Sequence, residues 1–260
     1  MRLDVYMTEN ALAPSRTRAR EWIENGLVLV NGKCVTKPAF PIAENTTPDI
    51  LVTGRLHPYV GRGGIKLNYA LETFGVSPTG MTCADIGAST GGFTDCLLQH
   101  GAARVFAIDS GSGQLDLSLR ADERVVNREH CNARYLALEM LGAPCGLVVA
   151  DLSFISQTCV LSGVVSILED GGTYIGLIKP QFECGPGATD RHGLIRSTEL
   201  HASAIRRVRD AASTAGLSML RVAVSPITGG DGNREFLCCC RKNAGGASVS
   251  DSIIEDVVRT

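Results

Sequence analysis

Residues 81–93, MTCADIGASTGGF, contain the turn that decides the fold. The run MTCADI, which ends at Ile86, predicts a strand, and the pattern through Leu97 and Leu98 after the turn predicts a helix. A strand, a glycine-rich turn and a helix in this order form the first unit of a doubly wound α/β sheet, which binds ligands at the carboxyl ends of its strands. Gly87 and Gly91 would allow the backbone of the turn to pass close to such a ligand.

Further apolar runs follow at the spacing of alternating strands and helices. They are VFAID, VVNRE, LVVAD, YIGLIKP, RVAVSPI and EFLCCCR. Runs this continuous are typical of strands buried on both faces of a parallel sheet. Little more than TGGDGN separates the last two runs, which predicts an antiparallel hairpin. We therefore expect an α/β fold with a Rossmann-like, seven-stranded sheet that is mostly parallel, with its last strand antiparallel.

The glycine-rich turn and the next strand carry features of a cofactor site. Asp109 ends the second strand, 22 positions after Gly87, where dinucleotide folds place an acid that accepts hydrogen bonds from ribose. The glycine spacing is G-x-x-x-G-G rather than G-x-G-x-x-G, and no G-K-[ST] is present, so pyrophosphate and triphosphate are disfavoured. A cofactor with a ribose and no phosphate fits better. This favours S-adenosylmethionine, with a nicotinamide cofactor as the alternative.

Four charged residues lie at the ends of predicted elements. Asp151 follows LVVA, Lys179 follows YIGLI, Glu235 precedes FLCCC, and Lys66 lies in GRGGIKL just ahead of a helical stripe. A doubly wound sheet brings such ends into one crevice. Two lysines there can take a proton from a hydroxyl group while two carboxylates orient them. The alternative is four unrelated salt-bridging groups on the surface, and spacing alone does not decide between them.

Composition narrows the class of protein. With 260 residues and 44% hydrophobic content, the chain can form one large and one small domain. The net charge of −2 does not indicate a nucleic-acid partner, so RNA binding would need a local basic patch. No apolar stretch approaches the roughly 20 residues that span a bilayer, so we expect no membrane insertion. The cysteines lack C-x-x-C spacing, and Cys238–Cys240 would alternate between the faces of a strand. We therefore expect no metal site and a cytoplasmic protein with reduced thiols.

The first part of the chain predicts a separate α+β domain. Ser15 is a suitable N-cap for a helix that runs to about Asn25 and is ended by Gly26. Asn31-Gly32 between apolar runs predicts a hairpin, because both turn positions need positive φ. We expect a small domain, a linker, a catalytic domain and a tail that is either a short helix or disordered, at residues 1–55, 56–64, 65–242 and 243–260.

Basic residues gather in this small domain, at Arg2, Arg16, Arg18, Arg20, Lys33 and Lys37. Arg16 and Arg20 share a helix face, which would leave little room for pairing within the helix alone. The pattern predicts either a phosphate-binding stripe or a solvated face balanced by Glu21 and Glu24. The segment RLDVYMTENALAPSRTRAREWIENGLVLVNGKCVTKP resembles the small RNA-binding domain named after the fourth small-subunit ribosomal protein, and this resemblance favours RNA binding.

Longer strings give a closer resemblance over nearly the whole chain. YVGRGGIKL, DIGASTGGFTDCLLQHGA, NREHCNARYL, VVADLSFIS, LIKPQFE and SPITGGDGNREFL resemble, in order, the TlyA family, whose members are also named hemolysins. The resemblance implies an RNA-binding domain joined to an FtsJ-like methyltransferase domain. It further implies that S-adenosylmethionine is used to methylate a ribose 2′-hydroxyl, expected on a cytidine, in ribosomal RNA or ribosomal subunits.

The same resemblance implies the site residues. The family's K-D-K-E tetrad falls on Lys66, Asp151, Lys179 and Glu235. Cofactor contacts fall on Gly87, Ala88, Ser89, Thr90, Gly91, Gly92, Phe93, Asp109, Asn132 and Asp151. This chain departs from the family at Gly61, where Ser is usual, in the linker residues 57–60, and in DSGSGQ at 109–114, where DVGYGQ is commoner. These changes bear on substrate choice and cofactor affinity and leave the tetrad intact.

Lys179 is our candidate for the general base. It must be neutral to act, whereas a free lysine titrates near 10.4. Lowering the pKa to about 7–8, as catalytic lysines do, requires roughly 3–5 kcal/mol. Two other classes of function are a membrane-active hemolysin and a non-catalytic RNA-binding protein. No basic amphipathic helix supports the hemolysin, and the intact tetrad and cofactor loop argue against the non-catalytic protein.

Overall fold

The computed structural model of the chain describes residues 1–43, 46–54, 57–244 and 248–260. They fall into two compact units, Met1–Pro58 and Tyr59–Thr260. The expected domain boundary at residues 55 and 56 lies outside the described residues, as do residues 245–247 of the expected tail. The finer division of the chain into four segments stays a prediction.

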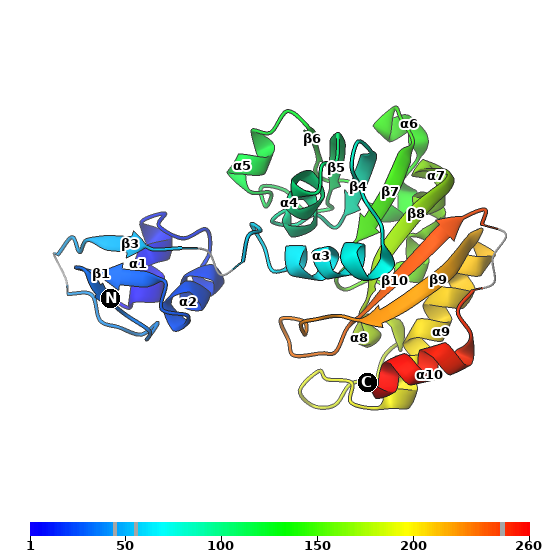
Figure 1. The fold of residues 1–260 in the computed structure, drawn as a ribbon. Coiled ribbons are helices and arrows are strands. Elements are labelled where there is room, and N and C mark those ends of the chain that lie inside the picture. The colour runs from blue at the N-terminus through cyan, green and yellow to red at the C-terminus, as the bar shows by residue number, and fades with distance from the viewer. Residues whose placement is uncertain (44–45, 55–56, 245–247) are drawn as a thin grey trace. The chain divides into compact units, whose positions relative to one another are not determined.

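The N-terminal unit packs two helices against a small antiparallel sheet (Figure 1). Its elements are α1 (Leu3–Glu9), α2 (Arg16–Glu24), β1 (Val28–Val30), β2 (Lys33–Cys34) and β3 (Ile50–Val52), with the strands in the order β2-β1-β3. Ser15 caps α2 by accepting a hydrogen bond from the Arg18 amide. Asn31 and Gly32 have φ angles of 50° and 75°, as the predicted hairpin turn requires.

The second unit is built on a seven-stranded sheet in the order β6-β5-β4-β7-β8-β10-β9. The strands are β4 (Thr82–Ile86), β5 (Arg104–Ile108), β6 (Val125–Arg128), β7 (Cys145–Ala150), β8 (Leu168–Ile178), β9 (Leu217–Val224) and β10 (Phe236–Lys242). Neighbours from β6 to β8 pair in parallel, and β10 is antiparallel to both β8 and β9. The predicted fold class is therefore confirmed.

Helices cover both faces of this sheet (Figure 1). One face packs against α3 (Gly63–Phe74), α4 (Gly92–Gln99) and α5 (Leu117–Arg120). The other packs against α6 (Leu138–Leu141), α7 (Leu161–Ile167), α9 (Thr198–Thr214) and α10 (Asp251–Arg259). Short turns complete the unit: η1 (Ala133–Tyr135), η2 (Gln157–Cys159) and α8 (Pro180–Glu183). Of the two alternatives for the tail, the structure has the helix, and Ile254 of α10 lies in the core.

The three consecutive cysteines of β10 divide between the two cores. Cys238 and Cys240 lie in the cluster with α9, and Cys239 lies in the cluster with α3. Alternation along a strand produces this arrangement. All of the cysteines are unpaired thiols, and no group of His, Cys, Asp or Glu in the described residues is arranged to hold a metal ion.

The strand order reverses between β4 and β7, because the chain adds β5 and β6 on one side of β4 and then returns to add β7 and β8 on the other. Crevices at such a reversal, outside the carboxyl ends of the strands, are where doubly wound folds bind ligands. The glycine-rich turn, Asp109, Asp151 and Lys179 all follow strands at this edge.

Candidate active site

The glycine-rich turn after β4 depends on its glycines for two separate reasons. A Cβ atom on Gly87, which has φ 82°, would lie 2.6 Å from the carbonyl oxygen of Asp151. A Cβ atom on Gly91, with φ 96°, would lie 2.2 Å from a methyl carbon of Leu119. Both positions therefore require glycine, Gly87 for close approach to the β7 loop and Gly91 for packing against α5.

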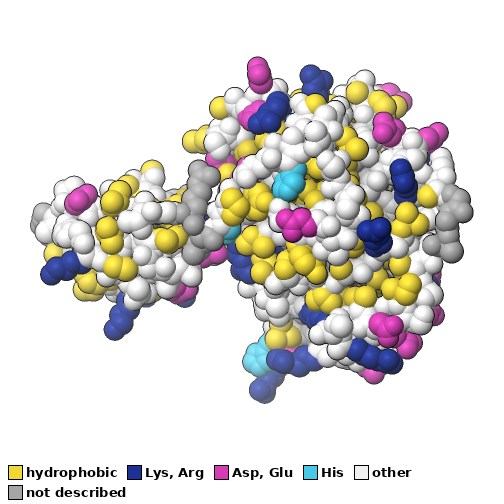
Figure 2. Space-filling model, in the orientation of Figure 1, with side chains coloured by type: hydrophobic (Ala, Val, Ile, Leu, Met, Phe, Trp, Pro, Cys, Tyr) yellow, Lys and Arg dark blue, Asp and Glu magenta, His cyan; other side chains and the backbone are white. Residues whose placement is uncertain are grey.

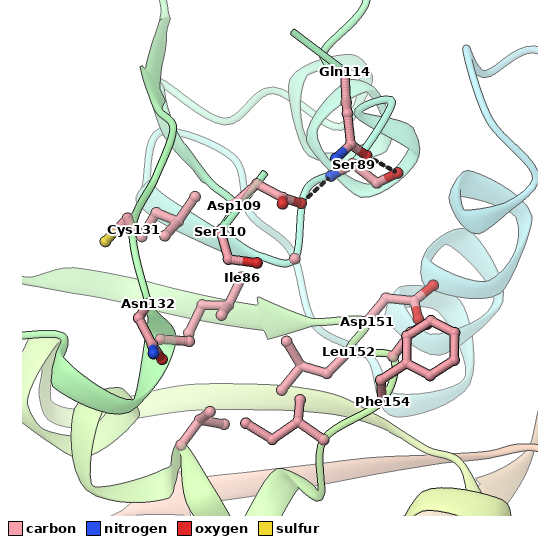
Figure 3. Close-up of a pocket in the computed structure, with 16 residues that line it drawn as sticks. Ile86, Ser89, Asp109, Ser110, Gln114, Cys131, Asn132, Asp151, Leu152 and Phe154 are labelled. Atoms are coloured by element: carbon pink, nitrogen blue, oxygen red, sulfur yellow. Dashed lines mark hydrogen bonds between the residues drawn. The ribbon is translucent and has the colours of Figure 1, made fainter. Parts of the chain in front are cut away.

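A cavity of about 400 Å³ opens beside this turn (Figure 3). Asp109 and Asn132 lie on one side of it, and Asp151, Leu152 and Phe154 lie on the other. Cavities of this size hold small-molecule ligands. Of the predicted cofactor residues, the structure places Gly87, Ser89, Asp109, Asn132 and Asp151 on its lining.

Asp109 anchors the turn as well as facing the cavity. Its Oδ2 accepts a hydrogen bond from the Ser89 amide at 2.8 Å, and its Oδ1 accepts one from the Gly111 amide at 2.7 Å. A carboxylate offers about four lone-pair sites, so both oxygens can still accept from a ligand hydroxyl. Asn132 caps η1 by accepting from the Arg134 amide at 3.1 Å.

A smaller cavity of about 190 Å³ lies next to the first. Its lining includes the remaining predicted turn residues except Gly91, namely Ala88, Thr90, Gly92 and Phe93, and also Lys179. Gly87, Ser89, Asp151 and Ser153 line both cavities. The two spaces therefore meet at Asp151 and Ser153, with the glycine-rich turn between them and Lys179 on the smaller side.

The four tetrad residues form two short ion pairs. Lys66 Nζ lies 2.6 Å from Glu235 Oε2, and Lys179 Nζ lies 2.6 Å from Asp151 Oδ1. Lys66 and Lys179 are 7% and 9% exposed and Glu235 is 2% exposed, so these are not the solvated surface pairs of the alternative interpretation. Lys66 lies in the first turn of α3 rather than ahead of the helix, which corrects our expectation of its place.

The two pairs also act on each other. Burial raises the pKa of Glu235, and Lys66 and Lys179 lower it by a smaller amount. Asp151 adds a repulsion that raises it further. The four charges therefore belong to one electrostatic unit at the carboxyl end of the sheet, which confirms that the fold brings these residues together.

Two groups near the cavities were missed by the sequence analysis. Ser153 accepts a hydrogen bond from Lys179 Nζ at 2.9 Å. Phe154 is 91% exposed and has a φ of 64°, which is uncommon for a bulky residue. Both follow Asp151 in DLSFIS, a loop without periodicity. Their position directly after a catalytic candidate was the available signal.

Asp85 is a further residue that the sequence analysis did not select. It is fully buried at the end of β4, where its Oδ2 accepts from the Thr94 hydroxyl at 2.7 Å. Its Oδ1 has no hydrogen-bond partner among the described residues. Burial raises the pKa of Asp85 to about 7, and Asp151 and Asp109 add to the increase. Its contact with Thr94 joins β4 to α4 on either side of the glycine-rich turn.

The basic residues of the N-terminal unit are held differently. Arg2 and Arg16 both contact Asp4, at 2.8 Å and 3.0 Å. Arg18 pairs with Glu21 at 3.0 Å and Arg20 with Glu24 at 3.6 Å. The expectation of little pairing within α2 was therefore wrong for Arg20, because i,i+4 spacing brings Glu24 into reach, whereas Arg16 pairs outside the helix with Asp4. Glu21 and Glu24 do pair with arginines of α2, as the alternative of a balanced face expects.

The other two residues of the predicted basic set, Lys33 and Lys37, are exposed, and neither has an ion pair among the described residues. Figure 2 shows Lys and Arg side chains standing out from the surface of this unit. The structure therefore leaves basic groups accessible on the N-terminal unit.

Each of the two units matches a known protein family. Residues 1–47 match the S4 domain family, and residues 59–242 match the FtsJ-like methyltransferase family. A 16S/23S rRNA (cytidine-2′-O)-methyltransferase, TlyA of Mycobacterium tuberculosis, is 41% identical over 99% of this chain and 95% of its own. The chain belongs to the TlyA family of FtsJ-like methyltransferases.

Other members of the TlyA family carry a different name. Hemolysin A of Brachyspira hyodysenteriae is 40% identical over 91% of this chain and 98% of its own. A solved structure of a hemolysin-named protein from Streptococcus thermophilus has a TM-score of 0.80 and 37% identity, over 100% of this chain and 94% of that one. In the described part of the present chain, no helix is both long and apolar enough to cross a membrane.

Proposed function

We propose that this protein transfers the methyl group of S-adenosylmethionine to a ribose 2′-hydroxyl of ribosomal RNA, on a cytidine as in the named TlyA relatives. The observation that carries the proposal is the Lys179–Asp151 contact on the lining of the smaller cavity, together with the buried Lys66–Glu235 pair that interacts with it electrostatically. One cavity suits a cofactor, and the other brings an acceptor within reach of an amine.

The residues around the larger cavity fit the cofactor. Asp109 supplies oxygens for ribose hydroxyls, and Gly87 and Ser89 of the turn line the same cavity. Asn132 lies on the lining where it can contact the base. When bound, S-adenosylmethionine supplies an electrophilic methyl group on a sulfonium. The protein must then supply an aligned nucleophile, and alignment accounts for much of the rate.

Lys179 is the group that takes the proton of the 2′-hydroxyl in this proposal. It lines the smaller cavity, and Asp151 and Ser153 fix the direction of its amine. General-base assistance of this kind contributes about 10²–10⁴ in rate. The Lys66–Glu235 pair is less exposed and joins the first turn of α3 to the residue that precedes β10.

The N-terminal unit contributes RNA binding in this proposal. The side chains of its Arg20–Glu24 pair are 55% and 52% exposed, and exposed ion pairs are worth only about 0–1 kcal/mol. Arg20 can therefore exchange its carboxylate for a phosphate at little cost, and guanidinium groups match phosphate oxygens well. Lys33 and Lys37 offer further exposed charges on the same unit.

Methyl transfer to isolated ribosomal subunits and to protein-free ribosomal RNA tests the proposal. Purified protein would be incubated with radiolabelled S-adenosylmethionine, and 2′-O-methylation would be mapped by nuclease-resistant sites. We expect a modified cytidine with wild-type protein and transfer that is about 10²–10⁴-fold slower with Lys179→Ala. Absence of transfer to every substrate, or modification of a base instead of a ribose, would contradict the proposal.

A further inference from the structure

Glu183 is a buried acid outside the tetrad that joins two segments of the active site. It lies on α8, four positions after Lys179, and is 2% exposed. Its Oε2 accepts a hydrogen bond from the Ser156 hydroxyl at 2.5 Å, and its Oε1 accepts one from the Gln157 amide at 2.8 Å. A buried polar network whose groups have hydrogen-bond partners makes the structure rigid and specifies one arrangement of the chain.

The contacts of Glu183 continue into a small buried network. The Ser156 hydroxyl also accepts from the Thr158 amide at 3.1 Å, where η2 begins. The Gln157 side-chain oxygen accepts from the Tyr174 hydroxyl of β8 at 2.8 Å. Burial raises the pKa of Glu183, while its hydrogen bonds to Ser156 and Gln157 favour the charged form. The network therefore ties the loop after β7 to both β8 and α8.

The loop held in this way, residues 151–157, carries the groups around the Lys179 amine. Asp151 and Ser153 contact that amine at one end of the loop, and Glu183 holds Ser156 and Gln157 at the other. Between them, Phe154 packs its ring against Phe182 of α8, with centroids 5.3 Å apart. The segment 179–183 therefore contacts the loop along its length.

We propose that Glu183 is a positioning residue for Lys179. By holding residues 156 and 157, Glu183 keeps Asp151 and Ser153 against the amine, so that the amine faces the acceptor cavity. Glu183 lines neither of the two cavities, so it acts through the loop and not by contact with a substrate. This inference rests on the proposed methyl transfer for its kinetic consequence.

The kinetic test compares Glu183→Ala with Glu183→Gln in the full-length protein. We expect Glu183→Ala to lower kcat by about 10²-fold, since a misplacement of about 1 Å can cost that much. The KM for ribosomal subunits and the Kd for S-adenosylmethionine should stay within about threefold. The Gln variant should recover most of kcat, because an amide oxygen can still accept from the Gln157 amide.

A matched pair of variants checks that the effect passes through the Ser156 contact. Ser156→Ala should lower kcat by a smaller factor, and adding it to Glu183→Ala should cause no further loss, as expected for coupled residues. Glu199 provides the control, because it accepts from the Ser197 hydroxyl at 2.6 Å at the start of α9. Glu199→Ala should leave kcat unchanged.

Hydrogen exchange gives a readout that does not depend on activity. The amides of residues 151–157 should exchange faster in Glu183→Ala than in wild type, with the β4 and β7 amides unchanged. If wild-type protein transfers no methyl group, the proposed function fails, and the exchange result still decides whether Glu183 orders the loop. If Glu183→Ala does not fold, the kcat and the hydrogen exchange of Ser156→Ala test the proposal instead.

Two outcomes would overturn the role of Glu183. One is wild-type kcat and wild-type exchange in Glu183→Ala, or in Ser156→Ala where that variant decides. The other is a parallel loss of cofactor affinity, RNA affinity and thermal stability, which would make Glu183 a general structural residue. A selective fall in kcat together with faster exchange of the loop supports the proposal.

Discussion

The ion pairs of this protein differ widely in solvent exposure, and a buried pair in the methyltransferase unit contrasts with an exposed pair in the N-terminal unit. In the methyltransferase unit, the side chains of Lys66 and Glu235 are 8% and 2% exposed, and their contact is 2.6 Å long. In the N-terminal unit, Arg20 and Glu24 are 55% and 52% exposed, and their contact is 3.6 Å long. A buried pair loses its hydration and has no other partner, so it keeps one geometry. An exposed pair can open towards water or a phosphate at little cost.

We expect the largest effect on methyl transfer at Lys179, because its amine is paired with Asp151 and is the proposed general base. Replacement by Ala or Arg should lower methyl transfer by about 10²–10⁴-fold, because Arg cannot give up its proton. The Kd for S-adenosylmethionine should change by only a few-fold. Single-turnover assays would measure the step. Lys242→Arg is the control, since the Lys242 amine binds the Val165 and Leu168 carbonyl oxygens. Substantial turnover by Lys179→Arg would exclude Lys179 as the base.

The sequence predicted where this chemistry lies better than how its groups are paired. The strands around the β4–β7 reversal, and the charges at their ends, follow from apolar runs and chain order. The pairing of Lys66 with Glu235 joins residues far apart in the sequence and depends on how α3 packs on the sheet. Periodicity carries no information on such a contact. The roles of Ser153 and Glu183 were missed for a related reason, because irregular loops and a one-turn helix leave no pattern.

The next largest effect is expected from breaking the Lys66–Glu235 pair. Lys66→Met leaves a buried carboxylate without a partner, which typically costs about 3–5 kcal/mol of stability. Adding Glu235→Leu should restore part of the loss. Burial raises the pKa of Glu235, and Lys66 opposes this increase. Without Lys66, the folded state of the variant should hold the Glu235 proton more tightly than its unfolded state does. The defect of the single variant should therefore grow as pH rises. Urea unfolding at pH 5.5 and pH 8 would test this, and equal defects at both would contradict it.

A smaller effect is expected at Asp109, which serves both the turn and the cavity. Asp109→Ala removes a charged acceptor, a change worth about 1.5–3 kcal/mol, and should weaken S-adenosylmethionine binding roughly 10- to 150-fold. Calorimetric titration measures the Kd directly. Asp122→Ala is the matched control, since Asp122 forms a local ion pair with Arg124 at 2.7 Å. An unchanged Kd in the Asp109 variant would place the ribose elsewhere.

For the exposed arginines of the N-terminal unit, we predict a change in the salt dependence of RNA binding. Replacing Arg16, Arg18 and Arg20 by Glu should lower the log–log salt slope of RNA binding by about 0.7–0.9 for each phosphate that the protein no longer neutralises. Cofactor affinity should not change. Filter binding of ribosomal RNA fragments over a salt series gives the slope, and Arg206→Ala with Arg259→Ala provides paired arginines from α9 and α10 as a control. An unchanged slope would mean that these arginines form only a solvated face.

The pairs of Asp4 combine both levels of exposure, because its side chain is buried while its arginine partners are partly exposed. The Arg2 hydrogen bond, with a further one from Arg16, lowers the pKa of Asp4 to about 2. This contribution to stability is present above the unfolded pKa and is lost as pH falls towards 2. Asp4→Asn should therefore destabilise the N-terminal unit by about 1–2 kcal/mol at pH 7, and by progressively less below pH 4.

Measured unfolding of the Asp4→Asn protein at pH 7 and pH 3 would show whether charge or packing dominates, since a loss that is equal at both values would indicate packing. The same variant releases Arg16 from its carboxylate. If the arginines do exchange carboxylate for phosphate, RNA affinity should rise or stay level in spite of the lower stability. A fall in RNA affinity would show instead that Asp4 holds Arg16 in the orientation that binds RNA. An ion pair with one buried member would then keep a single geometry, as the fully buried pair does.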